Sequence, residues 1–396
     1  MRKTLVLNGS HSELYLIRQA KQLGHFVVTT GNLPHASGHL EADLYIQADY
    51  SDQEAMLRIA REQKIDSVVS CANDFGAISA SYIAEKMGLP GHDPYATTLM
   101  LHTKDAFKNF ALANNMRVCP SVSFDTVEEA LEYEPVWYPA IVKPVDLTGG
   151  KGVNRVNNLE EYRKAIRVAF DWSRKKRIVV EKFVVGTYHS FSTFLVDKHV
   201  IGSFCDNEYS YNYPYYVTTS AGPADRADDV RDILIAEAEK YAELLNLADG
   251  IFHMQYVMDQ AGAPYVIDIT RRTSGDLYAE PVEKATGLPW SKWTVMAECG
   301  GYPRSCFSER GTQRAYYGRH CLMAEHNGIV KGVWISDELK DNIYDQIEWW
   351  RPEYSITNYL TDKVGIAFWH FHSWEEMRDK IGRIHELIKV ELTDTN

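Results

Sequence analysis

Short apolar runs alternate with amphipathic stretches through the first hundred residues. The apolar runs cover residues 4–8, 26–30, 44–47 and 66–70, and helix-like spacing covers residues 12–23, 52–63 and 75–87. Strands this short and this uniformly apolar are buried on both faces by the helices that connect them. The pattern therefore predicts a doubly wound parallel α/β domain over residues 1–103.

Beyond this region the pattern changes to paired strands joined by tight turns. Strands are expected at 121–124, 177–181, 188–196, 199–204, 251–258 and 264–269, with turns at 197–198 and 259–262. Helices are expected at 104–114, 127–133, 159–170 and 228–245. Antiparallel pairs with separate helices indicate an α+β architecture. The last part has strand patterns at 317–324, 329–334 and 365–370 and a helix pattern at 374–388.

A glycine-rich loop follows the apolar strand near residue 142. Gly149, Gly150 and Gly152 free the backbone so that its N–H groups can converge on an anion. Lys143 and Lys151 add full positive charges beside them. This combination suits a polyphosphate, but an ordinary exposed hairpin loop has a similar composition. From this loop alone, both interpretations stay open.

Two loops of the parallel sheet occupy the positions where such sheets bind ligands. Residues 9–11 and 71–74 follow the first and fourth strands, at the carboxyl edge. The first loop lacks the Gly-x-Gly-x-x-Gly pattern, so a dinucleotide site has little support and a hydride-transfer enzyme is a distant alternative. Both segments are equally compatible with ordinary connecting loops.

The formal net charge of −12 argues against nucleic acid and anionic membranes as partners. No apolar run is long enough to span a bilayer, and the N-terminus is too quickly polar for a signal peptide. Six scattered cysteines without a Cys-x-x-Cys pair favour reduced thiols over a structural zinc site. We therefore expect a cytoplasmic protein.

Five segments, in this order, resemble the ATP-grasp superfamily. They are Lys104 before a helix, 142–144 with the glycine-rich loop 146–152, 180–184 followed by Gly186, 250–255, and 265–276. Within this superfamily, the sequence most resembles the group that contains the large chain of carbamoyl-phosphate synthase and the carboxylate–amine ligases, including amino-acid and dipeptide ligases. The resemblance implies a two-lobed ATP-grasp domain over 104–310 and a small C-terminal α+β domain over 311–396.

The resemblance also assigns roles to residues that would clamp ATP. Lys104 and Lys143 would contact the phosphates, with Lys143 also near the adenine edge, and the loop carrying Lys151 would close over them. Glu181 to Val184 would form the hinge that pairs with the adenine. An acidic residue that usually binds the ribose is replaced near Tyr188, which puts ribose recognition in doubt.

Magnesium, in this family, would fall on Gln255, Asp268 and Thr270. Asp268 is shorter than the usual glutamate, and Thr270 replaces an amide with a hydroxyl, so the set holds a single certain anion. Asp276 or Glu280 are candidates to supplement it. This thinned set leaves the efficiency of turnover open.

Arg272 falls where the family keeps an arginine facing the transferred phosphoryl group. Arg271 should point the opposite way by strand alternation. Five tyrosines in residues 207–216 could line an acceptor pocket, and a surface or subunit contact is the alternative.

The predicted activity is an ATP-dependent ligase that activates a small-molecule carboxylate as an acyl phosphate and joins it to an amine. A nucleotide-binding protein with reduced turnover and a bicarbonate-using carboxylase are the alternatives. ATP and Mg²⁺ are the expected cofactors. The pattern identifies neither the acid nor the amine, and it leaves the oligomeric state open, with a homodimer as one option.

Overall fold

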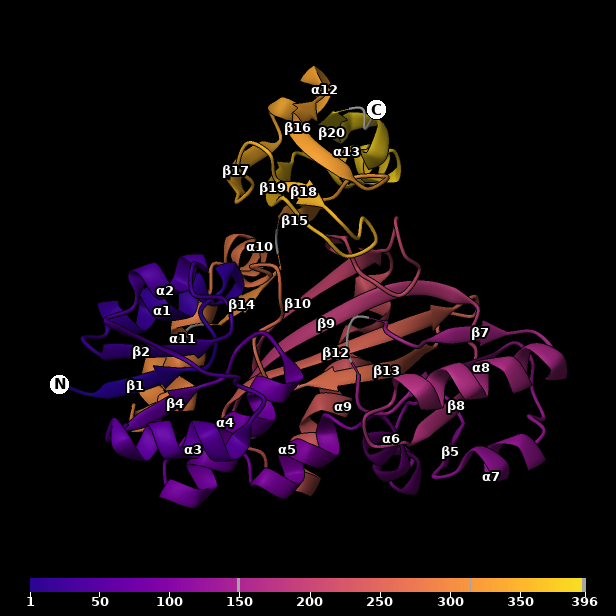
Figure 1. The fold of residues 1–396 in the computed structure, drawn as a ribbon, viewed down its shortest axis with the longest axis horizontal. Coiled ribbons are helices and arrows are strands. Elements are labelled where there is room, and N and C mark those ends of the chain that lie inside the picture. Colours follow the sequence, from indigo (N-terminus) through magenta and orange to yellow (C-terminus); the bar gives the residue numbers. More distant parts are fainter. Residues whose placement is uncertain (148–149, 309, 314, 394–396) are drawn as a thin grey trace.

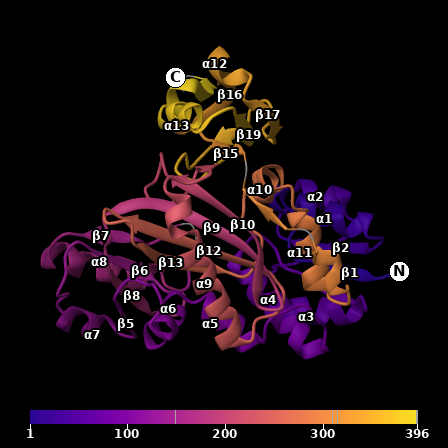
Figure 2. The same cartoon turned by 180° about the vertical axis from the view of Figure 1, so that it is seen from behind.

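The computed structural model describes residues 1–147, 150–308, 310–313 and 315–393. These residues form three regions arranged around one long sheet, with the C-terminal region standing above the other two (Figures 1 and 2). Gly149 lies outside the described residues, so its predicted role has no structural counterpart here.

The N-terminal region contains a parallel sheet, as its sequence predicts, and its strands lie in the order β3-β2-β1-β4. Its elements are β1 Lys3–Val6, β2 Phe26–Gly31, β3 Leu44–Gln47, β4 Ser67–Val69, α1 Leu14–Gln22, α2 Ser37–Glu41, α3 Gln53–Glu62 and α4 Asp74–Met87. Leu5 and Val6 alternate in β1, so Leu5 packs under α3 and α4 while Val6 packs towards α1. The same side receives Val295 from α11 (Trp290–Cys299), a helix that the sequence pattern did not reveal.

The middle region begins with a small antiparallel sheet in the order β5-β8-β6-β7. Its elements are α5 Tyr95–Leu101, α6 Lys104–Ala113, β5 Ser121–Phe124, α7 Val127–Glu132, β6 Ala140–Pro144, β7 Asn154–Val156, α8 Leu159–Trp172 and β8 Ile178–Lys182. Asn158 caps α8 by accepting a hydrogen bond from Glu161 N, which fixes where that helix starts. The helix buries Tyr162, Ile166 and Phe170 on the sheet.

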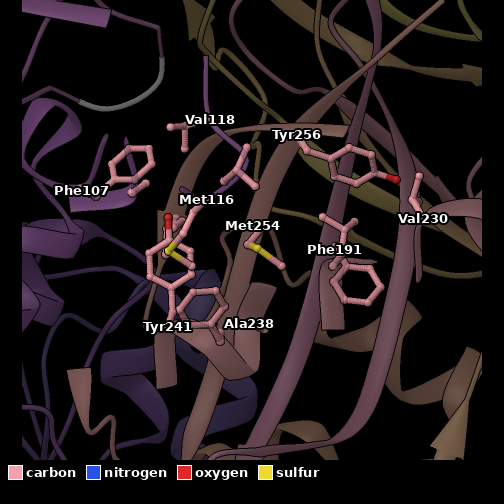
Figure 3. Packing of buried hydrophobic residues seen from close by; sticks show 14 of the residues in the cluster. Phe107, Met116, Val118, Phe191, Val230, Ala238, Tyr241, Met254 and Tyr256 are labelled. Atoms are coloured by element: carbon pink, nitrogen blue, oxygen red, sulfur yellow. The ribbon is translucent and has the colours of Figure 1, made fainter. Parts of the chain in front are cut away.

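Within the described residues, nine strands form the large central sheet, with the path β13-β12-β9-β10-β11-β15-β19-β17 and β14 beside β10. The bounds of its first part are β9 Gly186–Val196, β10 His199–Tyr209, β11 Thr219–Gly222, α9 Ala227–Leu245, β12 Gly250–Asp259, β13 Pro264–Thr270, α10 Ala279–Thr286 and β14 Gly311–Thr312. Figure 3 shows one face of this sheet, where Phe191, Met254 and Tyr256 pack against side chains of α6 and α9. That face is sealed, so a ligand site must use the other one.

The C-terminal region continues the central sheet and adds a second one. Strands β15 Tyr316–Leu322, β19 Gly365–Phe371 and β17 Ile343–Glu348 extend the large sheet, and β18 Ser355–Ile356, β16 Gly328–Ile335 and β20 Ile388–Thr393 form a three-stranded sheet. The helices are α12 Asp337–Lys340, α13 Trp374–Gly382 and α14 Ile384–Leu387. The prediction of a single helix over 374–388 was therefore wrong. Helix α13 ends at Gly382, a poor helix former, and Ile388 already begins β20.

All six cysteines are free, and five of them are buried. No helix in the described ranges has the length and apolar character needed to cross a membrane. The same ranges contain no cluster of three His, Cys, Asp or Glu side chains able to hold a metal ion.

Candidate active site

A cavity of about 350 Å³ lies between the small sheet and the open face of the central sheet, and it also meets α4. Ten predicted site residues line it: Lys104, Lys143, Gly150, Lys151, Glu181, Val184, Gln255, Asp268, Thr270 and Arg272. Gly152 is not in the lining, because the position of a Cβ there faces Pro144 and Trp172 at 2.8 and 3.1 Å. The segments that carry the resemblance thus meet at one place, although they lie far apart in the chain.

Glu181 is buried between two lysines. Its carboxylate oxygens lie 2.8 Å from Lys108 Nζ and 2.8 Å from Lys143 Nζ. Burial alone would raise the pKa of Glu181, but the two ammonium groups outweigh it and hold the pKa below its usual range. Burial also lowers the pKa of Lys108, against the opposing effect of Glu181.

The register of the small sheet explains half of this arrangement. Ile141 pairs with Glu181 across β6 and β8, so Lys143, two residues further along β6, is on the same face as Glu181. Lys108 comes from α6 and is fully buried. The sequence reasoning missed Lys108, although its spacing of four from Lys104 places both lysines on one helix face.

Lys104 links the glycine-rich segment to the central sheet. Its Nζ donates to the carbonyl of Leu147 at 2.8 Å and lies 3.8 Å from Asp268 Oδ2. The backbone N–H of Lys104 also donates to Val145 O at 3.2 Å. The start of the loop is therefore anchored to the helix that carries two of the site's lysines.

The tyrosine-rich segment after β10 packs on the other end of this loop. Tyr213 donates its hydroxyl hydrogen bond to Gly150 O at 3.0 Å. Gly150 has φ +72°, and a Cβ there would lie 2.6 Å from the Cβ of Tyr215. Tyr215 and Tyr216 line the cavity, whereas Tyr211 turns away and donates to Ile381 O in the C-terminal region.

The three predicted metal ligands project from the facing strands β12 and β13. Gln255 pairs directly with Asp268, while Thr270 is two residues further along β13. Thr270 is 6% exposed, and its hydroxyl has no hydrogen-bond partner among the described residues. A buried, unpaired oxygen that faces a cavity is compatible with a ligand from that cavity.

Glu208 is a further cavity residue that the sequence reasoning did not identify. Both of its carboxylate oxygens accept from Gln255 Nε2 at 2.9 Å. Burial and the nearby Asp206 carboxylate raise the pKa of Glu208 to about 8. The residue lies on the part of β10 beyond Phe204, where the predicted strand ended too early.

Arg271 and Arg272 point in opposite directions, as expected from strand alternation. Arg272 faces the cavity, and its Nε and Nη2 donate to Asp74 Oδ1 at 3.0 and 2.8 Å. Arg271 donates to Asp93 at 2.8 Å and to the carbonyl of Ala248 at 2.6 Å. Burial opposes the ionised form of Asp74, but Arg272 and His102 prevail and keep its pKa well below the usual range. Asp74 belongs to the 71–74 loop, so one of the two candidate loops of the parallel sheet reaches the site.

Asp276 joins all three regions at the edge of the cavity. Lys363 Nζ lies 2.5 Å from its Oδ1, Arg319 Nη1 lies 3.5 Å from its Oδ2, and His11 Nε2 lies 3.8 Å from Oδ1. The charge of Lys363, the hydrogen bond with His11 and the charge of Arg319 together outweigh burial and keep the pKa of Asp276 well below its ordinary value. Glu280, the other candidate supplement, is absent from the cavity lining and lies 4.0 Å from Lys284.

Tyr188, which stands near the sequence position where the family usually has a ribose-binding acid, lines the cavity. The adjacent His189 turns to the sealed face, where its ring stacks on Tyr256 at 5.1 Å. Burial lowers the pKa of His189 to about 4, so it carries no charge at neutral pH.

Residues 103–300 match the family described as the carbamoyl-phosphate synthase L chain, ATP binding domain. The chain belongs to this family. Among curated proteins, a formate-dependent phosphoribosylglycinamide formyltransferase of Prochlorococcus marinus is 29% identical over 190 residues, which cover 46% of this chain and 48% of that protein. A carbamoyl phosphate synthase large chain of Clostridium acetobutylicum is 23% identical over 269 residues, covering 64% of this chain and 24% of the relative. The chain spans about half the length of the curated formyltransferases that it matches.

Solved structures resemble the chain along its whole length. An L-amino acid ligase from Bacillus licheniformis has a TM-score of 0.84 at 19% identity, covering 100% of this chain and 99% of that one. A phosphoribosylglycinamide synthetase from Anaerococcus prevotii has a TM-score of 0.78 at 20% identity, covering 99% and 100%. These likenesses show that the fold is that of the ATP-grasp enzymes, as the sequence resemblance predicted.

Proposed function

We propose that the protein is an ATP-dependent ligase that activates a small-molecule carboxylate as an acyl phosphate and joins it to an amine. The observation that carries the proposal is the cavity itself. It gathers Lys104, Lys143 and Lys151 on one side and Gln255, Asp268 and Arg272 on the other. Basic groups for a triphosphate thus face oxygen donors and an arginine across one enclosed space.

Lys104 and Lys143 bind the phosphates in this proposal, and Lys151 reaches them from the glycine-rich loop. Glu181 positions Lys143 by its ion pair and accepts from the adenine amino group near Val184. The carboxylate keeps its charge because Lys108 remains beside it. Tyr188 contacts the ribose face in place of an acid, so we expect weaker discrimination at the ribose.

Gln255, Asp268 and Thr270 would hold magnesium, and their oxygen atoms fit a hard cation. The unpaired hydroxyl of Thr270 supports this assignment. The ion, when bound, neutralises charge on the phosphates during transfer. Asp268 is the sole carboxylate of the three, so the nucleotide's own oxygens are needed to complete the coordination.

Arg272 stabilises the negative charge that develops on the transferred phosphoryl group and then on the oxyanion formed by amine attack. Asp74 holds two nitrogens of its guanidinium and so fixes its orientation. The amine displaces phosphate from the acyl phosphate, giving an amide and inorganic phosphate. No protein nucleophile is required for either step.

The test is to incubate the protein with ATP, Mg²⁺ and a panel of carboxylates, each with a panel of amines and separately with hydroxylamine. ADP formation and hydroxamate formation report acyl phosphate. Lys143→Ala should lower kcat/KM for ATP by roughly a hundredfold, the scale seen when a group that stabilises the transition state is removed. Lys164→Ala is the matched control, because Lys164 is 75% exposed on α8. Absence of carboxylate-dependent ADP across the panel, or equal rates for Lys143→Ala and the wild type, contradicts the proposal.

A bicarbonate-using carboxylase is the second candidate. Solved biotin carboxylases are among the structures that share the fold, with TM-scores of 0.76 at 16–18% identity. Bicarbonate-dependent ADP formation without any amine favours this alternative. ATP binding by calorimetry that is indifferent to Mg²⁺, together with no ADP under any condition, instead identifies a nucleotide-binding protein without turnover.

A further inference from the structure

Five carboxylates line the cavity, and four of them have a basic partner. Among the described residues, Asp74 pairs with Arg272, Glu181 with Lys143, Asp268 with Lys104 and Asp276 with Lys363, all within 4.0 Å. Glu208 is the exception in the described part of the chain. Within the described part of the chain, Glu208 is thus the cavity carboxylate that has no ion-pair partner.

Charged groups lie near Glu208, namely the carboxylates of Asp206 and Asp268 and the guanidinium of Arg319, but among the described residues none forms an ion pair with it. Gln255 Nε2 donates to both carboxylate oxygens, and Ser220 lies opposite Glu208 in the register of β10 and β11. Arg319 is opposite Ser220 on the next strand, but its guanidinium is 3.5 Å from Asp276 and 3.3 Å from Cys321 Sγ. The nearest arginine in this row is thus already engaged elsewhere.

The wall beside Glu208 suits an organic cation. The chain turns directly from β10 into the tyrosine-rich segment, and Ser210, Tyr215 and Tyr216 line the same cavity as Glu208. Aromatic faces attract ammonium and guanidinium groups. Tyr216 already does so, since Lys363 Nζ lies 4.7 Å from its ring centroid.

We propose that Glu208 binds a positively charged ammonium or guanidinium group of the amine substrate. The inference rests on the proposed ligase function and narrows its substrate class to amines that arrive with a cation. Glu208 is half-buried, and a carboxylate that is shielded from water and has no ion-pair partner is costly to keep ionised, so the substrate supplies that partner. Its position beside Gln255 and on the same cavity as Arg272 places that substrate next to the predicted phosphoryl-transfer residues.

Magnesium is the competing occupant, and the contacts favour the organic cation. Both oxygens of Glu208 are directed at an amide N–H donor rather than at a second acidic group. No trio of His, Cys, Asp or Glu able to hold a metal is found in the described residues. The same cavity also carries Tyr215 and Tyr216, whose aromatic faces suit an organic cation.

The test is Glu208→Gln, which keeps the shape and removes the charge. We use the amine that gives the fastest ADP formation in the panel, with hydroxylamine as an acceptor that is uncharged at neutral pH. We expect KM for the amine to rise by roughly tenfold or more, the cost of losing a charged partner, and this change should exceed any change in the hydroxylamine reaction. Glu208→Asp should recover part of the affinity. Glu391→Gln, on an exposed part of β20, is the control and should behave as wild type.

Three results overturn the cation site while leaving the ligase standing: an unchanged KM for the amine, an equal loss with hydroxylamine, or a raised Mg²⁺ requirement in both reactions. The last would identify Glu208 as a metal ligand. The cation site is also overturned if the protein forms a hydroxamate with hydroxylamine but forms no product with any amine of the panel. If the wild type forms neither hydroxamate nor ADP with any carboxylate, the ligase proposal fails and the cation site falls with it.

Discussion

Glu181 combines deep burial with two cations, which makes its environment sensitive to losing either one. Lys108 is fully buried and contacts the carboxylate at 2.8 Å. We expect Lys108→Met to lower the free energy of unfolding by about 3–5 kcal/mol, because a buried carboxylate loses a partner. Urea titration followed by circular dichroism measures the change. Lys164→Met, in an exposed pair with Glu160, should leave stability unchanged.

The ion pair of Glu181 and Lys108 also makes the stability of the protein depend on pH, in a direction that follows from the pKa of Glu181. The folded state lowers the pKa of Glu181 below its ordinary value of 4.5, so its stabilising contribution is present above that pH and is lost as the pH falls through the folded-state pKa. The stability gap between wild type and Lys108→Met should therefore shrink in acid. A gap that stays constant or widens below pH 4.5 contradicts this explanation.

Two adjacent arginines provide a matched test of which side chain faces the cavity. Arg272 faces the cavity and Arg271 is held by Asp93 and the carbonyl of Ala248 on the far side. Arg272→Lys loses the fork that Asp74 orients, and we expect kcat to fall by roughly a hundredfold with a small change in melting temperature. Arg271→Lys should lower the melting temperature and largely spare kcat. Steady-state kinetics and thermal melting separate the two, and the reverse pattern would refute the assigned orientations.

At the scale of elements, the glycine-rich loop depends on the tyrosine-rich segment. Gly150→Ala introduces a side chain at φ +72° that meets Tyr215, so we expect the loop to lift and KM for ATP to rise by roughly tenfold. Trypsin should then cleave faster after the exposed Lys151. Tyr213→Phe removes one hydrogen bond and should produce a smaller effect in the same direction.

Gly24→Ala is the control for backbone strain without a side-chain clash. Gly24 has φ +81°, but nothing lies within 4 Å of its Cβ position. The substitution should cost about 1–2 kcal/mol of stability from the left-handed backbone and leave KM for ATP unchanged. Equal changes in KM for both variants would show that the contact with Tyr215 is irrelevant.

The same scale shows what the sequence could predict. Short strands such as Leu44–Gln47 and Ser121–Phe124 were placed correctly, as was the hairpin turn at Asp197 and Lys198, where both residues have positive φ. The end of β10 was missed because Asp206 and Glu208 interrupt the apolar pattern. Glu208 lines the cavity and Asp206, on the same strand, is fully buried, so a strand that serves a site resembles a polar loop in sequence.

At the scale of the whole molecule, the contacts between regions could not be predicted. Lysines are expected at helix surfaces, so the burial of Lys108 could not be predicted from its helix, although its spacing from Lys104 places both on one face. Its partner Glu181 is 73 positions away, and pairing them requires the tertiary fold. Ten of the twelve residues predicted from the motifs line the cavity, whereas Glu208, Arg319 and Lys363 come from segments without a motif.

Asp276 is the residue through which the three regions are coupled, because His11, Arg319 and Lys363 reach it from different parts of the fold. Asp276→Asn leaves Lys363, whose side chain is 11% exposed, and the buried Arg319 without their carboxylate, and we expect a loss of about 3–5 kcal/mol. Differential scanning calorimetry should show a lower first transition, as the C-terminal region separates from the rest. Asp197→Asn is the control: it breaks an exposed pair with Arg304 in a turn that asparagine accommodates. Equal melting curves for the two variants would mean that Asp276 does not couple the regions.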